Sequence, residues 1–220
     1  MPNKRESIRG LNFFSTLNEK QLSLLYDMSN IVKYPKDAVL YYENEEFNKI
    51  FFLVSGLLKI YKIDKYENEI FLYNIYENSL ISELTSIDNS VIHCFSNAEF
   101  LEDSAILEVN FTQFKDNFLS KNILNNEFIN EILLKTHQLH CVVNRELVFD
   151  AAAKVAFMLM DDLIMFNKLK RQEVSFMLHI QPETLSRVLK KLKRADIIDI
   201  ENLNIIIKDK EALKAIYIGK

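Results

Sequence analysis

Two runs of helical periodicity meet between Arg171 and Arg194, and the second run carries groups that can read DNA. After Pro182, which suits a first helical position, apolar residues recur at i, i+3, i+4 and i+7: Leu185, Val188, Leu189 and Leu192. The opposite face carries Glu183, Ser186, Arg187, Lys190, Lys191 and Arg194. Such a face suits the major groove of duplex DNA, where base edges and phosphates are accessible. The spacing therefore predicts a helix-turn-helix.

The residue types of this second helix indicate which groups of the DNA each side chain would contact. Arg187 can donate two hydrogen bonds to a guanine, Glu183 can accept one from cytosine N4, and Ser186 can pair with either base type. We expect the lysines at phosphates, where they add affinity without sequence information. The predicted DNA contacts are Arg171, Gln181, Glu183, Thr184, Ser186, Arg187, Lys190, Lys191 and Lys193. The alternative is an ordinary surface helix whose charges are only solvated.

Composition is that of a soluble globular protein of one large or two modest domains, with 49% apolar and 26% charged residues in 220. The net charge is −4, yet residues 168–194 hold eight basic and two acidic residues. A local basic patch on an acidic body is compatible with a DNA-binding regulator. No apolar run is long enough to span a membrane and no signal core opens the chain, so we expect a cytoplasmic protein.

The two cysteines, Cys94 and Cys141, restrict the chemistry further. They fit a reducing compartment and cannot supply a four-cysteine zinc or iron–sulfur site within one chain. The sequence also lacks a nucleophile elbow, a phosphate-binding loop and a zincin motif. We therefore predict that the protein is not an enzyme.

The first half of the chain changes from a helical to a β pattern. A short helical stretch runs from Leu11 to Met28, with Asn18 as its expected cap. From Ile31 to Val109, short runs rich in Ile, Val, Phe and Tyr alternate with turns, which favours a small antiparallel roll. Only three glycines are present, so the turns must use Asn and Asp, as at Asp37, Asn44, Asp64, Asn68, Asn78 and Asn89.

The second half is predicted to be helical with one hairpin. Residues 122–149 contain no Gly or Pro, and a narrow seam that would pair with a second copy comprises Ile129, Ile132, Thr136, Leu139 and Val143. Asp150 is expected to cap the next helix and Asp209 the last one, and Glu201-Asn202-Leu203 separates the two strands of a wing. We predict an α+β protein with a β-roll over residues 1–118, a dimerisation helix over 119–149 and a winged helix-turn-helix over 150–220.

This order of elements resembles the bacterial CRP/FNR family of transcription regulators over nearly the whole chain. The resemblance lies in LNFFSTLNEKQLSLL, YPKDAVLYYEN, FFLVSGLLKIYK and ENEIFLYNI, and above all in RQEVSFMLHIQPETLSRVLKKL. Glu183-x-x-Ser186-Arg187 resembles the base-reading triplet of the FNR-type branch. The resemblance implies a cyclic-nucleotide-binding-like jelly roll and a homodimer on a palindrome of TTGA-like half-sites. It also implies RNA polymerase as a partner.

The sequence departs from the family at defined positions. His179 stands at the helix-turn-helix break, where family members often have Gly, and residues 166–170 leave room only for a tight link before the motif. Ser82-Glu83 is similar to the Gly-Glu pair of the cyclic-nucleotide branch, but the following SIDNSVIHCFS contains no arginine for a phosphate. Cyclic AMP is therefore not expected. The N-terminal cysteine cluster of the iron–sulfur branch is missing, so we expect no iron–sulfur cluster.

Two groups of residues are candidates for sensing a signal. Glu83, His93 and Cys94 would line an effector pocket in the roll. His137, His140 and Cys141 fall at i, i+3 and i+4 of the long helix and could present ligands to a haem or a metal. The alternative is an exposed histidine pair and a cysteine buried for packing. A second function also stays open, namely a ligand-binding or protein-interaction module whose tail only resembles a helix-turn-helix.

Overall fold

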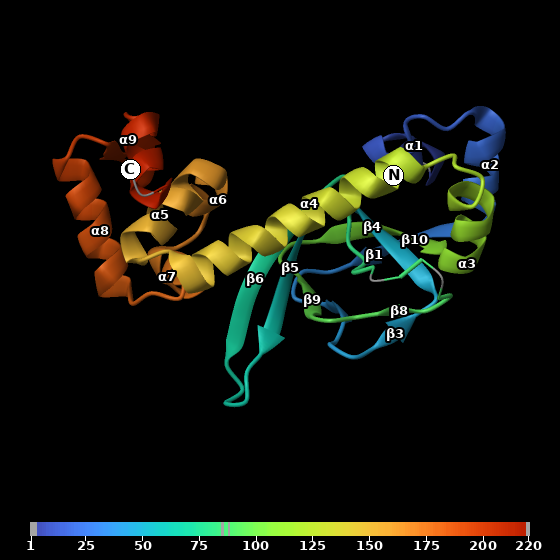
Figure 1. Cartoon of the computed structure of the whole chain (residues 1–220), viewed down its shortest axis with the longest axis horizontal. Coiled ribbons are helices and arrows are strands. Elements are labelled where there is room, and N and C mark those ends of the chain that lie inside the picture. Colours follow the sequence, from blue (N-terminus) through green and yellow to red (C-terminus); the bar gives the residue numbers. More distant parts are fainter. Residues whose placement is uncertain (1–3, 85, 88, 219–220) are drawn as a thin grey trace. The chain divides into compact units, whose positions relative to one another are not determined.

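The computed structural model describes residues 4–84, 86–87 and 89–218 (Figure 1). The chain divides into two compact units, Met1–Gln138 and Leu139–Lys220. The division falls inside the long helix α4, Asn125–Val143. The sequence prediction treated this helix as a segment of its own, and that three-part division stays a prediction.

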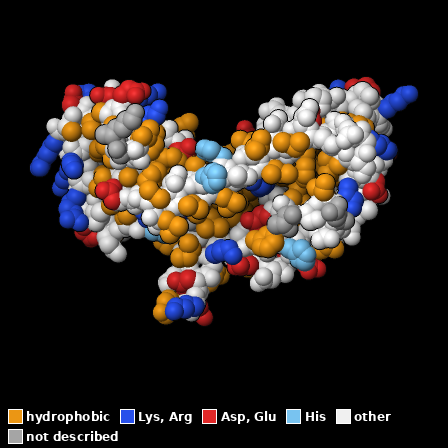
Figure 2. Space-filling view, viewed as in Figure 1, with side chains coloured by type: hydrophobic (Ala, Val, Ile, Leu, Met, Phe, Trp, Pro, Cys, Tyr) orange, Lys and Arg blue, Asp and Glu red, His pale blue; other side chains and the backbone are white. Residues whose placement is uncertain are grey.

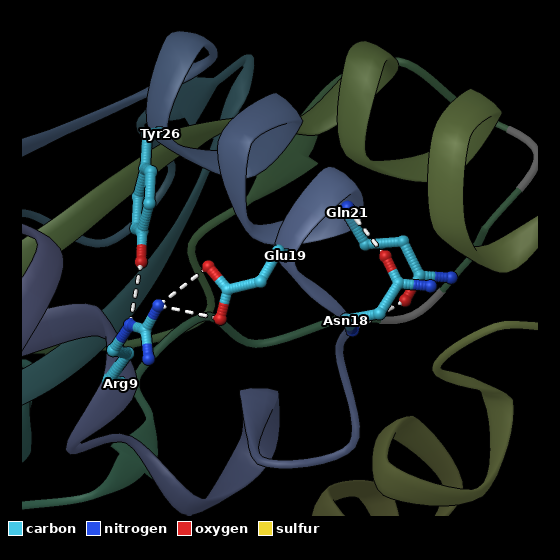
Figure 3. A network of polar contacts seen from close by, with 5 residues as sticks. All are labelled: Arg9, Asn18, Glu19, Gln21 and Tyr26. Carbon is cyan, nitrogen blue, oxygen red and sulfur yellow. Dashed lines mark hydrogen bonds and ion pairs between the residues drawn. The ribbon is translucent and has the colours of Figure 1, made fainter.

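The N-terminal unit opens with short helices: α1 at Lys4–Arg9, the 3-10 helix η1 at Asn12–Phe14 and α2 at Glu19–Asp27. Asn18 caps α2 as predicted, since its side chain accepts from the backbone N–H of Gln21 while the Gln21 side chain accepts from Asn18 N–H. Figure 3 shows the same network extending to α1. The Arg9 guanidinium lies 2.7 Å from both carboxylate oxygens of Glu19, and its Nε lies 3.4 Å from the hydroxyl of Tyr26. These contacts fasten α1 to α2.

Two four-stranded antiparallel sheets form the roll, in the orders β1-β10-β4-β7 and β2-β9-β5-β6, beside the small pair β3-β8. The strands are β1 Ser29–Tyr34, β2 Val39–Tyr41, β3 Glu46–Phe47, β4 Lys49–Ser55, β5 Leu57–Ile63, β6 Glu69–Tyr76, β7 Ser79–Leu80, β8 Ile92–His93, β9 Asn97–Phe100 and β10 Ser104–Asn110. In Figure 1, β5 and β6 extend together as a long hairpin. The predicted antiparallel roll is confirmed.

Two buried clusters lie among the described residues of this unit. One is rich in phenylalanine, and its rings come from the N-terminal helices, β4, the short helix α3 at Phe111–Phe114 and the π-helix η2 at Lys115–Leu119. Phe13 and Phe52 are typical members, with ring centroids 4.8 Å apart. The other cluster draws on strands of both sheets and includes Tyr41, Leu53, Ile60, Phe100 and Ile106. The alternating apolar residues of each strand thus face a shared interior.

Asn and Asp take over the turns that glycine usually makes. Asp37, Asn44 and Asn78 have φ values of 65°, 71° and 66°, as the shortage of glycine predicted. Between β5 and β6, Asp64 and Asn68 bracket the turn, but Glu67 is the residue with positive φ (66°). Asp64 accepts hydrogen bonds from the N–H groups of Tyr66 and Asn68, which places the left-handed residue between them.

The C-terminal unit begins in the last turns of α4 and continues with a π-helix, η3, at Asn144–Val148. The remaining elements are α5 Ala151–Asp161, α6 Leu163–Lys168, α7 Arg171–Met177, α8 Pro182–Arg194, β11 Ile198–Glu201, β12 Asn204–Ile207 and α9 Lys210–Ile218. Asp150 and Asp209 cap α5 and α9 as predicted, by accepting from the N–H groups three residues on. The single helix expected after Asp150 is interrupted at Asp162, because Asp162 caps a new helix, α6.

Among the described residues, no helix is long and apolar enough to cross a membrane.

Candidate DNA-binding interface

The two helices of the motif, α7 and α8, are joined by a turn that depends on a left-handed residue. His179 has a φ of 51°, and its N–H donates to the carbonyl of Phe176 at 3.0 Å. Ile180 N–H donates to Ser175 O, also at 3.0 Å. A glycine would adopt this backbone without strain, so His179 needs a compensating contact. Its Nδ1 lies 2.8 Å from Glu146 Oε2, and this carboxylate belongs to η3. The turn is therefore closed by a side chain from outside the motif.

The two faces of α8 separate as the sequence predicted. Leu185, Leu189 and Leu192 are buried and Val188 is partly buried. The exposed positions are Glu183, Ser186, Arg187, Lys190, Lys191, Lys193 and Arg194. Figure 2 shows Lys and Arg side chains gathered along the outer edge of the region that contains α8. The structure thus gives one face of this helix to the hydrophobic core and the other to solvent.

Gln181 and Thr184 lie at the start of this face. Gln181 occupies the N-cap position of α8 and makes no capping hydrogen bond through its side chain, so it is exposed and not committed to the helix end. The Thr184 hydroxyl accepts a hydrogen bond from Arg187 Nη2 at 3.1 Å. This bond orients the guanidinium along the first turns of α8, which is where base-reading residues of a recognition helix lie.

Two of the predicted DNA contacts, Arg171 and Lys193, also contact the wing. Lys193 Nζ lies 2.8 Å from Asp199 Oδ1 on β11. Arg171 is half-buried, its guanidinium lies 4.9 Å from the centre of the Phe166 ring, and its Nη2 donates to the carbonyl of Leu203 at 2.7 Å. Burial lowers the pKa of Arg171. Arg171 therefore braces the wing, a role that sequence spacing could not reveal.

The wing itself is the predicted hairpin. β11 and β12 pair in antiparallel register from Ile198 opposite Ile207 to Glu201 opposite Asn204. Asn167 fastens β12 to α6 through both groups of its side-chain amide, which accepts from Ile205 N–H at 2.8 Å and donates to Ile205 O at 3.0 Å. Residues 169–170 form the tight link between α6 and α7, in agreement with the departure noted in the sequence.

The seam of α4 is exposed to solvent along its length. Ile129 and Leu139 are each 53% exposed, and of the residues of α4 Phe128 alone is buried. The remaining seam positions, Ile132, Thr136 and Val143, are also exposed. Figure 2 shows apolar side chains gathered over the region that contains α4. An apolar face of this size on one helix is typical of an interaction surface.

The roll interior brings together two of the three predicted effector residues. Glu83 accepts from the backbone N–H of Phe95 at 2.9 Å and from the Tyr73 hydroxyl, and it lies in the electrostatic surroundings of Cys94. Burial, with Glu83 nearby, raises the pKa of the Cys94 thiol to about 12. His93 is the last residue of β8 and is exposed, whereas Cys94, which follows it, is buried. The Nδ1 of His93 lies 3.0 Å from Glu46 Oε1. The structure therefore leaves His93 outside this interior.

The sequence reasoning missed the cation of this interior. Lys135 on α4 donates from Nζ to the carbonyl of Ile81 at 3.1 Å, and burial lowers its pKa to about 8, opposed by the charges of Glu83 and Glu131. Glu131 accepts from Leu80 N–H at 3.2 Å. The signal available in the sequence was a lysine that directly follows the apolar run Ile132-Leu133-Leu134. These contacts tie α4 to the segment that follows β7.

The histidines and cysteine of α4 do not form a metal site in the part of the chain that the structure describes. No group of three or more His, Cys, Asp and Glu side chains suited to a metal ion occurs there. His137 and His140 are exposed, and Cys141 is half-buried with a pKa raised by burial. A thiol with a raised pKa is a poorer metal ligand, because the thiolate is the binding form.

The described residues of the roll do not fit a cyclic nucleotide phosphate. The sequence contains no arginine between Arg9 and Arg145. The cation found in the interior is Lys135, and it already faces Glu83 and Glu131. The hydroxyl of Tyr41 is buried and has no hydrogen-bond partner among the described residues. One neutral donor beside a carboxylate does not offset the charge of a buried phosphate.

Comparison with known proteins agrees with this architecture. The profile of the cyclic nucleotide-binding domain matches residues 31–121, and that of the Crp-like helix-turn-helix domain matches residues 156–216. Among curated proteins, no sequence matches the chain.

Several solved structures share the fold. A CooA mutant from Carboxydothermus hydrogenoformans is 19% identical, with a TM-score of 0.74 over 94% of this chain and 95% of that one. FixK2 from Bradyrhizobium japonicum is 17% identical, with a TM-score of 0.64 over 86% and 96%. CLP from Xanthomonas campestris, described as a c-di-GMP responsive global regulator, is 13% identical, with a TM-score of 0.64 over 86% and 99%.

A β-roll, a long helix and a winged helix-turn-helix in this order define the fold of a DNA-binding transcription regulator. The chain belongs to the CRP/FNR family, whose members are transcription regulators that bind DNA and act as dimers.

Proposed function

We propose that the protein is a homodimeric regulator that reads a palindrome of TTGA-like half-sites through α8. The observation that carries this proposal is the exposed face of α8, on which Glu183, Ser186 and Arg187 share the first two turns. Arg187 would bind a guanine through O6 and N7, and Glu183 would accept from a cytosine N4. Lys190 and Lys191 follow on the same face and would neutralise phosphates.

The exposed seam of α4 supports the homodimer. A second copy would cover Ile129, Ile132, Thr136, Leu139 and Val143 with the same residues, as a twofold interface requires. Two α8 helices would then enter successive major grooves, about 34–36 Å apart. The dimer would act in the cytoplasm on promoter DNA and would meet RNA polymerase there.

The signal would be received inside the roll, at the cluster of Tyr41, Tyr73, Glu83, Cys94 and Lys135. A ligand that pairs with the unpartnered Tyr41 hydroxyl would alter the surroundings of Glu83, and Lys135 carries that change to α4. A change of this kind shifts the balance between two conformations of the dimer only if the ligand prefers one of them. The chemistry of the cluster suits a small neutral or hydrogen-bond-donating ligand better than an anion.

The test is DNA binding by fluorescence anisotropy at several salt concentrations. The duplexes are a TTGA-type palindrome and a scrambled sequence of the same composition, and the oligomeric state is measured in parallel by light scattering. We expect a dimer that prefers the palindrome and whose log affinity falls linearly with log salt. A protein that binds no duplex at low salt would instead be an interaction module with a helix-turn-helix-like tail. A monomer that binds one half-site would contradict the dimer alone.

A further inference from the structure

The tip of the wing carries an apolar residue in a backbone conformation that such residues rarely adopt. Asn202 and Leu203 join β11 to β12, and their φ values are 49° and 70°. A two-residue hairpin turn with both φ values positive is the type I′ turn, in which Asn and then Gly are strongly preferred. Asn202 follows the preference and Leu203 does not. A bulky residue with positive φ is an outlier that calls for an explanation.

Burial does not explain the leucine, because its side chain is 84% exposed. Local flexibility does not explain it either, because several contacts hold this turn. Arg171 donates to the carbonyl of Leu203 itself, and Asn167 fixes Ile205 two residues further on. Strained residues that their surroundings hold in place gather at functional sites. The structure therefore presents one apolar side chain at the end of a braced hairpin.

We propose that Leu203 is a DNA contact that packs against the deoxyribose walls of the minor groove beside the half-site read by α8. The inference rests on the proposed function, since it adds a second DNA-contacting element to the same unit. The wing is fastened to both helices of the motif, to α7 through Arg171 and to α8 through the 2.8 Å ion pair of Lys193 with Asp199. When α8 enters the major groove, the wing tip is carried with it.

The residue types at the tip favour groove walls over phosphates. Residues 201–204 contain no lysine or arginine, and Glu201 is acidic, so the tip cannot neutralise backbone charge. Minor-groove binders frequently use apolar side chains such as leucine as contacts, inserting them between base steps. Asn202 and Asn204 are exposed on either side of Leu203, and their amides can donate to the acceptors of A·T pairs in that groove.

The test uses Leu203→Gly and Leu203→Asn, because both residues tolerate positive φ and neither presents a large apolar group. We expect both variants to be as thermally stable as the wild type or more so. Their affinity for the palindrome should fall on the order of tenfold, as expected when one leucine side chain is no longer buried in the complex. The slope of log affinity against log salt should not change, whereas the control Lys190→Gln should make it shallower.

Hydroxyl-radical footprinting locates the contact on the DNA. The wild-type dimer should protect sugars in the minor groove outside each half-site, and Leu203→Gly should lose this protection while keeping protection within the half-site. Wild-type affinity and an unchanged footprint in both variants would overturn the proposal. If, in addition, transcription with RNA polymerase were reduced, the wing tip would contact protein and not DNA. A shallower salt slope for the variants would also contradict a purely apolar contact.

Discussion

The Nδ1 atom of His179 lies 2.8 Å from the Oε2 atom of Glu146, so the turn of the helix-turn-helix is joined to the π-helix that follows α4. Glu146 also lies 2.7 Å from Arg145 Nε and 3.8 Å from Lys154 Nζ. His179 has no glycine-like freedom at its positive φ, and its Nε2 is buried without a partner among the described residues. The geometry of the recognition helix therefore depends on one carboxylate outside the motif.

Glu146→Gln should loosen this turn. The new amide can still accept a hydrogen bond from His179. It lacks the negative charge of the carboxylate, around which His179, Arg145 and Lys154 gather. We expect a loss of about 1 kcal/mol in the free energy of unfolding, less than the roughly 1.5–3 kcal/mol of a buried hydrogen bond to a charged group, because the pair is partly exposed. Urea denaturation followed by circular dichroism measures it. Glu211→Gln on α9 is the control, and an equal loss there would remove the special role of Glu146.

The Glu146 carboxylate should also make the stability of the protein sensitive to acid. Burial by itself raises the pKa of Glu146, but the hydrogen bonds from Arg145 and His179 outweigh it and the net pKa is lowered. A carboxyl with a lowered folded-state pKa stabilises the protein above its ordinary pKa, and this stabilisation is lost as the pH falls through the folded-state value. The free energy of unfolding should thus fall below about pH 4.5. The Glu146→Gln variant should show a flatter profile over that range, and parallel profiles would contradict the assignment.

The buried Lys135 should affect the free energy of unfolding at alkaline pH, at the opposite end of the pH range from Glu146. Burial lowers its pKa to about 8, below the ordinary lysine value, so the unfolded chain binds more protons than the folded one from about pH 8 to 10.5. This contribution makes stability rise with pH in that window. The difference in free energy of unfolding between the wild type and Lys135→Met should therefore grow in favour of the wild type from about pH 7.5 to 9.5. Lys121→Met is the control, and an equal growth in that variant would remove the special role of Lys135.

Gly56 occupies a position at which an added side chain should destabilise the fold. Its φ is 101°, and an added Cβ would lie 2.1 Å from Ser104 Oγ and 2.9 Å from Ser104 Cα. Gly56→Ala should therefore cost at least about 1–3 kcal/mol, because it adds backbone strain to a steric clash. Thermal denaturation measures it. Ser104→Gly should restore only part of the stability in the double variant, since the strain at φ remains. Complete rescue would mean that the clash alone is responsible.

Substitution of Arg187 should reduce the sequence specificity of DNA binding, whereas substitution of Lys190 should reduce affinity for all duplexes. Arg187→Ala should lower the preference for the palindrome by about 1–3 kcal/mol per contact and relax the choice of one base pair in each half-site. Lys190→Gln should weaken binding to all duplexes and reduce the salt slope by about 0.9 for each phosphate that is no longer neutralised. Binding to a set of single-base variants of the palindrome distinguishes the two. An Arg187→Ala dimer with unchanged base preference would refute its reading role.

Elements whose causes are local were predictable from the amino-acid sequence. The apolar stripe of α8 follows from residues at i, i+3, i+4 and i+7 that must share one face, and the helix starts at Asp150 and Asp209 follow from a side chain that reaches three residues on. The hairpin follows from Asn202 between two β-branched runs. Each of these features depends on neighbours within one or two turns of the chain.

Which distant side chains meet depends on the tertiary structure. Glu146 and His179 are 33 residues apart, and Arg171 and the Leu203 carbonyl are 32 apart. Lys135 reaches the carbonyl of Ile81 across 54 residues, and the adjacent His93 and Cys94 lie in different surroundings, since His93 is exposed and Cys94 is buried. No periodicity encodes such pairs. They arise because packing of whole elements sets the distance between groups, and that distance governs their hydrogen bonds and charges.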